Sequence, residues 1–164
     1  MQLGALKPKN QRFLVSRYQT SAEIAGAIVK AIDESLPSAN LIKHHFESPN
    51  KLESCKMIFL FCKEMIPYKR ESGARQTAKT IPRILSDAQK HGGDCKHMAT
   101  LSASLCKVLN IPCCLRLIAQ VPGTTTPNHI YTVAKINGKE VIIDAVLKNF
   151  DTEARYNYKY DIII

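Results

Sequence analysis

The stretch Gly92-Gly93-Asp94-Cys95-Lys96-His97-Met98-Ala99 places a cysteine where a glycine turn opens into a helix. Asp94 is a favourable N-cap residue, and an apolar stripe begins at Met98. The N–H groups in the first turn of a helix lack internal partners, and the helix dipole adds partial positive charge there. This environment favours the thiolate, which is the nucleophilic form of cysteine. The sequence therefore predicts a nucleophilic Cys95 at the start of a helix over about 95–110.

Beyond Pro112 the periodicity changes from helical to alternating, which predicts strands. Three such runs follow, over 113–121, 129–136 and 139–146. Asn137-Gly138 lies between the last two, and this dipeptide is the strongest short signal for a β-hairpin. The sequence therefore predicts an antiparallel sheet after the helix.

The register of this hairpin brings a histidine and an aspartate together. A two-residue turn pairs Lys135 with Glu140, and these opposite charges support the register. Continuing outward, His129 lies opposite Val146 and becomes a diagonal neighbour of Asp144 on the same face. Such neighbours lie roughly 7–8 Å apart, within reach of ring-shaped side chains. Cysteine, histidine and aspartate in this order suggest a nucleophile, a base and an orienting group.

The part of the chain before Gly92 is predicted to be mainly helical. We expect residues 1–18 to form an irregular arm and Thr20 to cap a helix that ends at Leu36-Pro37. A connection over 38–49, a core helix over about 50–66 and a loop over 68–75 follow, and the stretch 76–90 then contains a further short helical segment interrupted near Pro82. Residues 147–164 add a last strand or wrap the domain. The fold class is therefore α+β, with N-terminal helices packed on a small antiparallel sheet.

The bulk composition is that of an ordinary globular domain. The chain has 164 residues, 45% hydrophobic and 23% charged, which fits one domain over 19–164 with its core over about 65–150. No apolar run approaches the ~18 residues needed to cross a bilayer, so no membrane partner is expected. Residues 1–13 lack the apolar stretch of a secretory signal, which favours the cytoplasm.

Cysteine usage agrees with a reducing compartment. The six cysteines are even in number, but the chain is too long and too apolar to need a disulfide framework. Cys55 and Cys62 are seven residues apart in a helical segment and should both face the core, whereas Cys113 and Cys114 should point to opposite faces of a strand. We expect all except Cys95 to be reduced and mostly buried.

A net charge of +9 would suit an anionic partner, but the lysines are scattered along the chain. The densest cationic stretches do not interleave aromatic residues as a groove for single-stranded nucleic acid does. Nucleic-acid binding is therefore not the main role expected, although the net charge does not exclude it. A metal site formed by Cys95, His97, His91 and His129 matches no strong zinc spacing. We expect no metal and no cofactor.

The motifs resemble those of the transglutaminase-like superfamily. Gly93-Asp94-Cys95, a following helix and then Asn110-Ile111-Pro112 are similar to the Gly-Asp-Cys turn and the Ile-Pro helix end of that family. Asn128-His129-Ile130-Tyr131 and Ile142-Ile143-Asp144-Ala145 look like its histidine and aspartate strands. The likeness covers about residues 65–150. Compact relatives with a similar core occur in bacteria and phages.

The resemblance implies a papain-like fold in which Cys95 is the nucleophile, His129 the base and Asp144 the orienting acid. It implies a cysteine protease, amidase or acyltransferase that acts on peptide-like amide bonds of a protein or peptide through an acyl-enzyme. The backbone N–H of Cys95 is the natural oxyanion donor, and Gln76 or Gln89 would supply a second one. The alternative is a catalytically inactive descendant that serves as a structural or assembly protein, associated with virions if it is phage-encoded.

Overall fold

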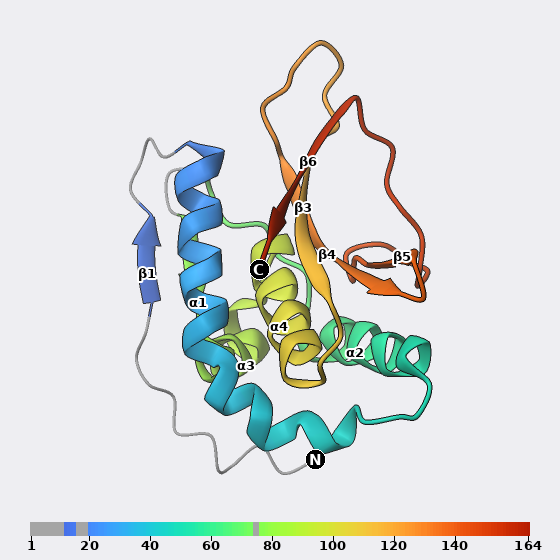
Figure 1. The fold of residues 1–164 in the computed structure, drawn as a ribbon. Coiled ribbons are helices and arrows are strands. Elements are labelled where there is room, and N and C mark those ends of the chain that lie inside the picture. Colours follow the sequence, from blue (N-terminus) through green and yellow to red (C-terminus); the bar gives the residue numbers. More distant parts are fainter. Residues whose placement is uncertain (1–11, 16–19, 74–75) are drawn as a thin grey trace.

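The computed structural model describes residues 12–15, 20–73 and 76–164. Helices α1 (Ser21–Ile42), α2 (Lys51–Met65), α3 (Ile81–His91) and α4 (Cys95–Val108) pack beside a four-stranded antiparallel sheet. The sheet has the order β5-β4-β3-β6, with β3 (Cys113–Ala119), β4 (His129–Ile136), β5 (Lys139–Ile143) and β6 (Tyr158–Ile163). Figure 1 shows α4 between α1 and the sheet. The expected α+β class, with helices packed on a small antiparallel sheet, is confirmed.

Helix α4 is buried around most of its circumference because two layers cover it. Ala99 and Ala103 pack with α1 residues such as Ile28 in one cluster, while Met98, Leu101 and Leu105 join the cluster that includes α2 and α3. On the sheet side, the Ser102 and Thr132 hydroxyl oxygens lie 2.8 Å apart. Small side chains such as Ser102 therefore let α4 lie close to the sheet.

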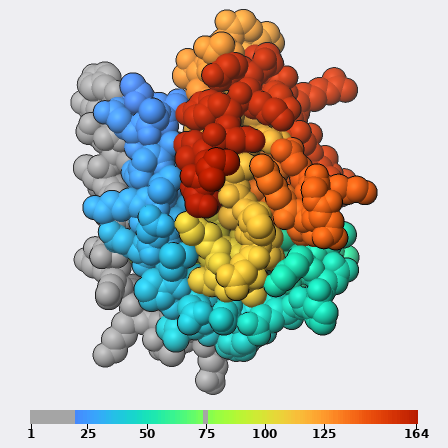
Figure 2. Space-filling view, in the orientation of Figure 1, coloured from blue at the N-terminus to red at the C-terminus, as the bar shows by residue number. Residues whose placement is uncertain are grey.

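The hairpin register is the one expected from Asn137-Gly138. Lys135 pairs with Glu140 and Ile136 with Lys139, and Asn137 and Gly138 both adopt positive φ. Of the two alternatives for residues 147–164, the structure contains the last strand: β6 pairs with β3. Side chains of β6 also pack with α1, and Figure 2 shows the C-terminal segment beside that helix.

Four expectations for local structure need correction. Helix α1 does not end at Pro37 but continues to Ile42, because Ala39 and Ile42 are buried in the core beyond it. Within the segment expected to be an irregular arm, Arg12–Val15 forms strand β1, and residues 1–11 and 16–18 lie outside the described residues. Strand β1 pairs with β2 (Gln76–Lys79), a strand in a stretch for which only a short helical segment was expected.

The fourth correction concerns α2, which was expected to be a core helix. It buries one face, including Cys55, Ile58 and Cys62, but Leu52 and Leu60 are exposed. Helix α3 begins at Ile81 with Pro82 in its first turn, where proline is tolerated because the missing N–H would lack a partner. Thr20 caps α1 as expected, through a capping box with Glu23, and Asn50 is the N-cap of α2.

A buried arginine with three acidic partners lies at the core of this fold. Arg116 on β3 is 1% exposed and forms ion pairs with Glu140, Glu153 and Asp161. These contacts tie β3 to β5, to β6 and to the segment between β5 and β6. Among the described residues, no helix combines the length and apolarity needed to span a membrane.

Candidate active site

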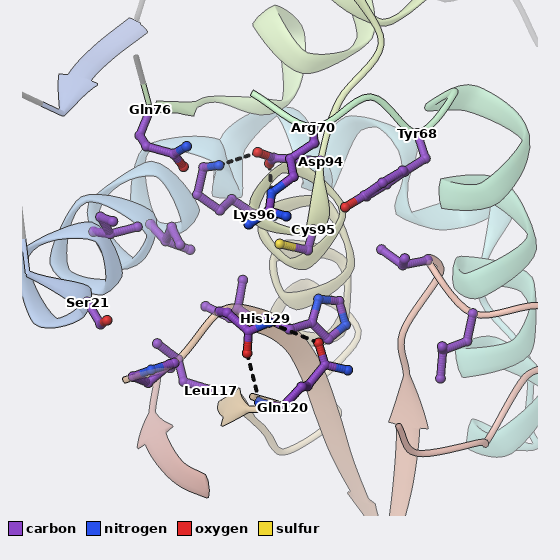
Figure 3. Close-up of a pocket in the computed structure, with 17 residues that line it drawn as sticks. Ser21, Tyr68, Arg70, Gln76, Asp94, Cys95, Lys96, Leu117, Gln120 and His129 are labelled. Carbon is purple, nitrogen blue, oxygen red and sulfur yellow. Dashed lines mark hydrogen bonds and ion pairs between the residues drawn. The ribbon is translucent and has the colours of Figure 1, made fainter. Parts of the chain in front are cut away.

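Cys95 is the first residue of α4 and lines a cavity of about 370 Å³. It is partly exposed, whereas the five other cysteines are buried and all six are free thiols. Cys113 and Cys114 belong to different core clusters and thus face opposite sides of β3, as expected. Figure 3 shows the Cys95 sulfur at the start of α4, facing the cavity. Cys95 is therefore the cysteine best placed to meet a ligand.

The first turn of α4 is held by Asp94. Its carboxylate accepts a hydrogen bond from the Lys96 N–H at 3.2 Å and pairs with the Lys96 ammonium group, while Nδ1 of His97 lies 3.1 Å from the same carboxylate. Burial acts to raise the pKa of Asp94, but the hydrogen bonds and charges of His97 and Lys96 outweigh it and hold that pKa well below its ordinary value. A capped, charged first turn fixes the position of the Cys95 backbone.

A neighbouring segment leaves no space for a side chain at Gly92 or Gly93. The Gly93 N–H donates to the Pro67 carbonyl at 3.0 Å, and the Lys69 N–H donates to the Gly93 carbonyl at 2.8 Å. A Cβ at Gly92, where φ is +65°, would lie 2.6 Å from the Pro67 oxygen, and a Cβ at Gly93 would lie 2.6 Å from Ile66. The two glycines therefore allow the loop after α2 to pack directly against the turn before Cys95.

His129 and Asp144 are joined by a hydrogen bond, with 2.6 Å between Nε2 and Oδ2. Since the carboxylate can only accept, Nε2–H is the donor and Nδ1 is the ring nitrogen that remains for another partner. The other carboxylate oxygen of Asp144 accepts from the Val146 N–H at 3.2 Å. The contact between His129 and Asp144 is the one that the hairpin register predicted, but the strand expected over 139–146 ends at Ile143, so that Val146 does not pair with His129. The contact orients the imidazole at the edge of the cavity.

The charge state of His129 depends on both of its neighbours. Burial acts to lower the pKa of His129, but the hydrogen bonds and negative charges of Asp144 and Cys95 raise it to about 9. The imidazole is therefore protonated at neutral pH when it faces the thiolate. The arrangement has the groups needed for a thiolate–imidazolium pair with an orienting carboxylate.

The walls of the cavity differ in character. Ile24 and Ile28 of α1, with Leu117 and Ile130 of the sheet, form an apolar wall, and Val146 and Leu147 provide apolar surface after β5. Gln120 and Asn128 lie near the sheet end and hold each other through a backbone–side-chain bond of 2.8 Å and a side-chain bond of 3.2 Å. The cavity thus combines an apolar wall with amide groups at its sheet end.

The two proposed oxyanion side chains have different positions. Gln76 lines the cavity, and its amide nitrogen donates to the Ser72 carbonyl at 3.0 Å. Gln89 is exposed on α3 and does not line the cavity. The structure therefore does not bring Gln89 to the site, because its helix turns that position toward solvent.

Of the residues in the alternative metal site, Cys95 and His129 line the cavity, whereas His91 and His97 do not. The His97 ring lies behind the first turn of α4 against Asp94, and His91 is exposed at the end of α3. No cluster of three or more metal-ligand side chains suited to an ion occurs in residues 12–15, 20–73 and 76–164.

Sequence reasoning missed Tyr68 and Arg70, which line the cavity from the loop after α2. They lie 27 and 25 residues before Cys95, and no spacing rule connects them with it. The paired glycines were the available signal, because a double glycine next to a capped helix indicates close backbone approach by another segment.

Comparison with known proteins adds little. No protein-family model and no curated protein match the chain. It is similar to the solved structure of a candidate cysteine protease from Cytophaga hutchinsonii, with 17% identity and a TM-score of 0.48. The match covers 82% of this chain and 48% of the other, so the chain spans about half the length of that protein. A likeness this distant assigns no activity.

Proposed function

We propose that the chain is a cysteine-dependent hydrolase or acyl transferase that acts on peptide-like amide bonds. The observation that carries this proposal is the Cys95 thiol at the N-terminus of α4 in one cavity with His129, whose Nε2 is bound to Asp144. The order of these residues along the chain agrees with the motif resemblance to the transglutaminase-like superfamily, to which we propose that the chain is related.

In the acylation step the Cys95 thiolate attacks the carbonyl carbon, and the carbonyl electron pair moves onto oxygen. Collapse of this intermediate breaks the C–N bond, and protonated His129 donates its proton to the leaving amine. In the second step neutral His129 takes a proton from water or from an acceptor amine, which attacks the thioester and releases Cys95. Asp144 keeps the imidazole in orientation and stabilises its charged form.

The first test uses 4-nitrophenyl acetate, an activated ester that needs no defined binding pocket. We expect a burst of about one 4-nitrophenol per chain and an acetyl group on Cys95 by peptide mass spectrometry. The Cys95→Ala variant should show only the slow background rate of surface amines. Wild-type protein that gives no burst and carries no acetyl group on Cys95 would contradict the proposal and favour a non-catalytic descendant of the fold.

The second test separates the reactions that share this acyl-enzyme. Unfolded β-casein is incubated with the protein and a fluorescent primary amine, and peptide cleavage, ammonia release and amine incorporation are measured together. Cleavage indicates a protease, ammonia alone an amidase or deamidase, and incorporated amine an acyl transferase. Each activity should vanish in Cys95→Ala and fall strongly in His129→Ala, since the nucleophile and the proton carrier act as one unit.

A further inference from the structure

Tyr68 is held beside the nucleophile by its backbone. It forms an isolated parallel bridge with Gly93, flanked by the hydrogen bonds of 3.0 Å from Gly93 to Pro67 and 2.8 Å from Lys69 to Gly93. The positions that a Cβ would take at Gly92 and Gly93 are occupied by this segment. The loop and the Gly-Asp-Cys turn are therefore joined through their backbones, which places Tyr68 next to the turn that carries Cys95.

The Tyr68 side chain points into the site. It lines the same cavity as Cys95 and His129, and Figure 3 shows its hydroxyl directed toward the Cys95 sulfur from a different wall than His129. Its hydroxyl has no hydrogen-bond partner among the described residues, and the side chain is half exposed. A fixed donor near the thiol without an internal partner is available to a bound substrate.

The electrostatic surroundings keep this hydroxyl protonated. Burial and then the negative charges of Cys95 and Asp94 raise the pKa of Tyr68, and the positive charge of Arg70 only partly opposes them. The phenol therefore donates a hydrogen bond to an anion at the pH values where the cysteine reacts as thiolate. A tetrahedral intermediate on Cys95 places such an anion, the former carbonyl oxygen, close to the sulfur.

Gln76, the other candidate donor in the cavity, is less suited to this role. Its amide nitrogen already donates to Ser72 in its own loop, so that turning it toward Cys95 would cost that bond. Tyr68 has no such bond to give up among the described residues.

We propose that the Tyr68 hydroxyl is the second oxyanion donor of this site, together with the backbone N–H of Cys95. The assignment rests on the function proposed above. As the Sγ–C bond forms and the carbonyl π pair moves to oxygen, Tyr68 donates a hydrogen bond to that oxygen and keeps its proton. When the intermediate collapses, the electron pair returns and the hydrogen bond weakens. Tyr68 is thus a catalytic residue that stays covalently unchanged.

The test compares two reactions of the same thiol. Acetylation by 4-nitrophenyl acetate passes through an oxyanion, whereas alkylation by iodoacetamide displaces iodide at a saturated carbon and forms none. We expect Tyr68→Phe to slow acetylation of Cys95 by about 10²–10³, the usual loss for one oxyanion donor. Alkylation of Cys95 should change by less than about twofold, because the thiolate and His129 are untouched. Tyr158→Phe, which removes a hydroxyl from a half-exposed tyrosine on β6, should leave both rates unchanged.

Three results would overturn the assignment. Equal acetylation rates of Tyr68→Phe and wild type would show that the hydroxyl does not act in this step. Parallel losses of acetylation and alkylation would show that Tyr68 acts on the thiolate rather than on the oxyanion. A large loss in Gln76→Ala with none in Tyr68→Phe would assign the role to Gln76. Absence of acetylation in the wild type, with normal alkylation, would instead reject the proposed function itself and this assignment with it.

Discussion

Nε2 of His129 lies 2.6 Å from Oδ2 of Asp144, although the two residues are 15 positions apart. The β4–β5 hairpin brings the two residues close: its pairing runs to Thr132 and Ile143, His129 begins β4, and Asp144 follows β5 directly. The same face looks toward the start of α4, where Cys95 lines the shared cavity. The hairpin turn at Asn137-Gly138 thus helps to place Asp144 where it raises the pKa of His129. The first two predictions concern this pair.

We expect iodoacetamide to modify Cys95 first in the native protein, with the other cysteines reacting only after unfolding. Cys95 is partly exposed, whereas the rest are buried, and burial raises the pKa of Cys62 to about 12. In His129→Ala the rate at neutral pH should fall roughly tenfold or more, because the imidazolium no longer favours the thiolate. Peptide mass spectrometry after timed quenching measures both effects. Simultaneous labelling of all six cysteines would argue against a distinctive Cys95.

We expect Asp144→Asn to lower the pKa of His129 from about 9, since the hydrogen bond and charge of Asp144 help to raise it. Nuclear magnetic resonance titration of the His129 ring measures this directly. The folded-state pKa lies above the value of 6.5 for an unperturbed histidine, so protonation of His129 stabilises the folded state. This stabilisation is fully present below pH 6.5 and is lost as the pH rises through 9. Its size is about 3 kcal/mol.

The wild type should therefore lose stability to urea between neutral pH and about pH 9, and Asp144→Asn should show a smaller loss over that interval. The same slope in both proteins would mean that Asp144 does not control the protonation of His129.

We expect Gly92→Ala and Gly93→Ala each to destabilise the fold by about 1–3 kcal/mol, because the new methyl group would overlap Pro67 or Ile66. Urea denaturation gives the free energy of unfolding. Gly26→Ala is the matched control: no atom lies within 4 Å of its Cβ position, and the residue is exposed in α1. Alanine there should stabilise the helix by about 0.5–1 kcal/mol. Equal effects at all three glycines would contradict the close approach of the Tyr68 segment.

We expect Arg116→Met to cost about 3–5 kcal/mol of stability, because three carboxylates would lose their buried partner. The Arg116 hydrogen bonds lower the pKa of Glu140 and Asp161. Their stabilisation is present above the unfolded-state pKa and is lost as the pH falls through the folded-state values, so the variant should lose less stability on acidification than the wild type. Arg155→Met, which removes an exposed arginine, should change stability by less than about 0.5 kcal/mol. A similar loss in both variants would rule out a special role for Arg116.

Local sequence signals were sufficient to predict the start of α4 and the turn of the β4–β5 hairpin. The helix begins at Cys95 with Asp94 as its cap, and Asn137-Gly138 forms the turn of the hairpin, as the sequence predicted. These features depend on backbone preferences of a few adjacent residues, which the sequence displays directly. Pro37 shows the limit of such signals, because tertiary burial of Ala39 and Ile42 keeps α1 helical beyond a residue that disfavours helix.

The sequence by itself determined the α+β class, the capped start of α4 and the register of the β4–β5 hairpin, because each follows from patterns and interactions of residues close along the chain. Only the tertiary structure decided that Tyr68 and Arg70 face Cys95, that Gln89 lies outside the cavity and that Gln76–Lys79 pairs with β1 as a strand. Those outcomes depend on which distant segments pack together, and packing is decided by complementary surfaces rather than by local conformational preference.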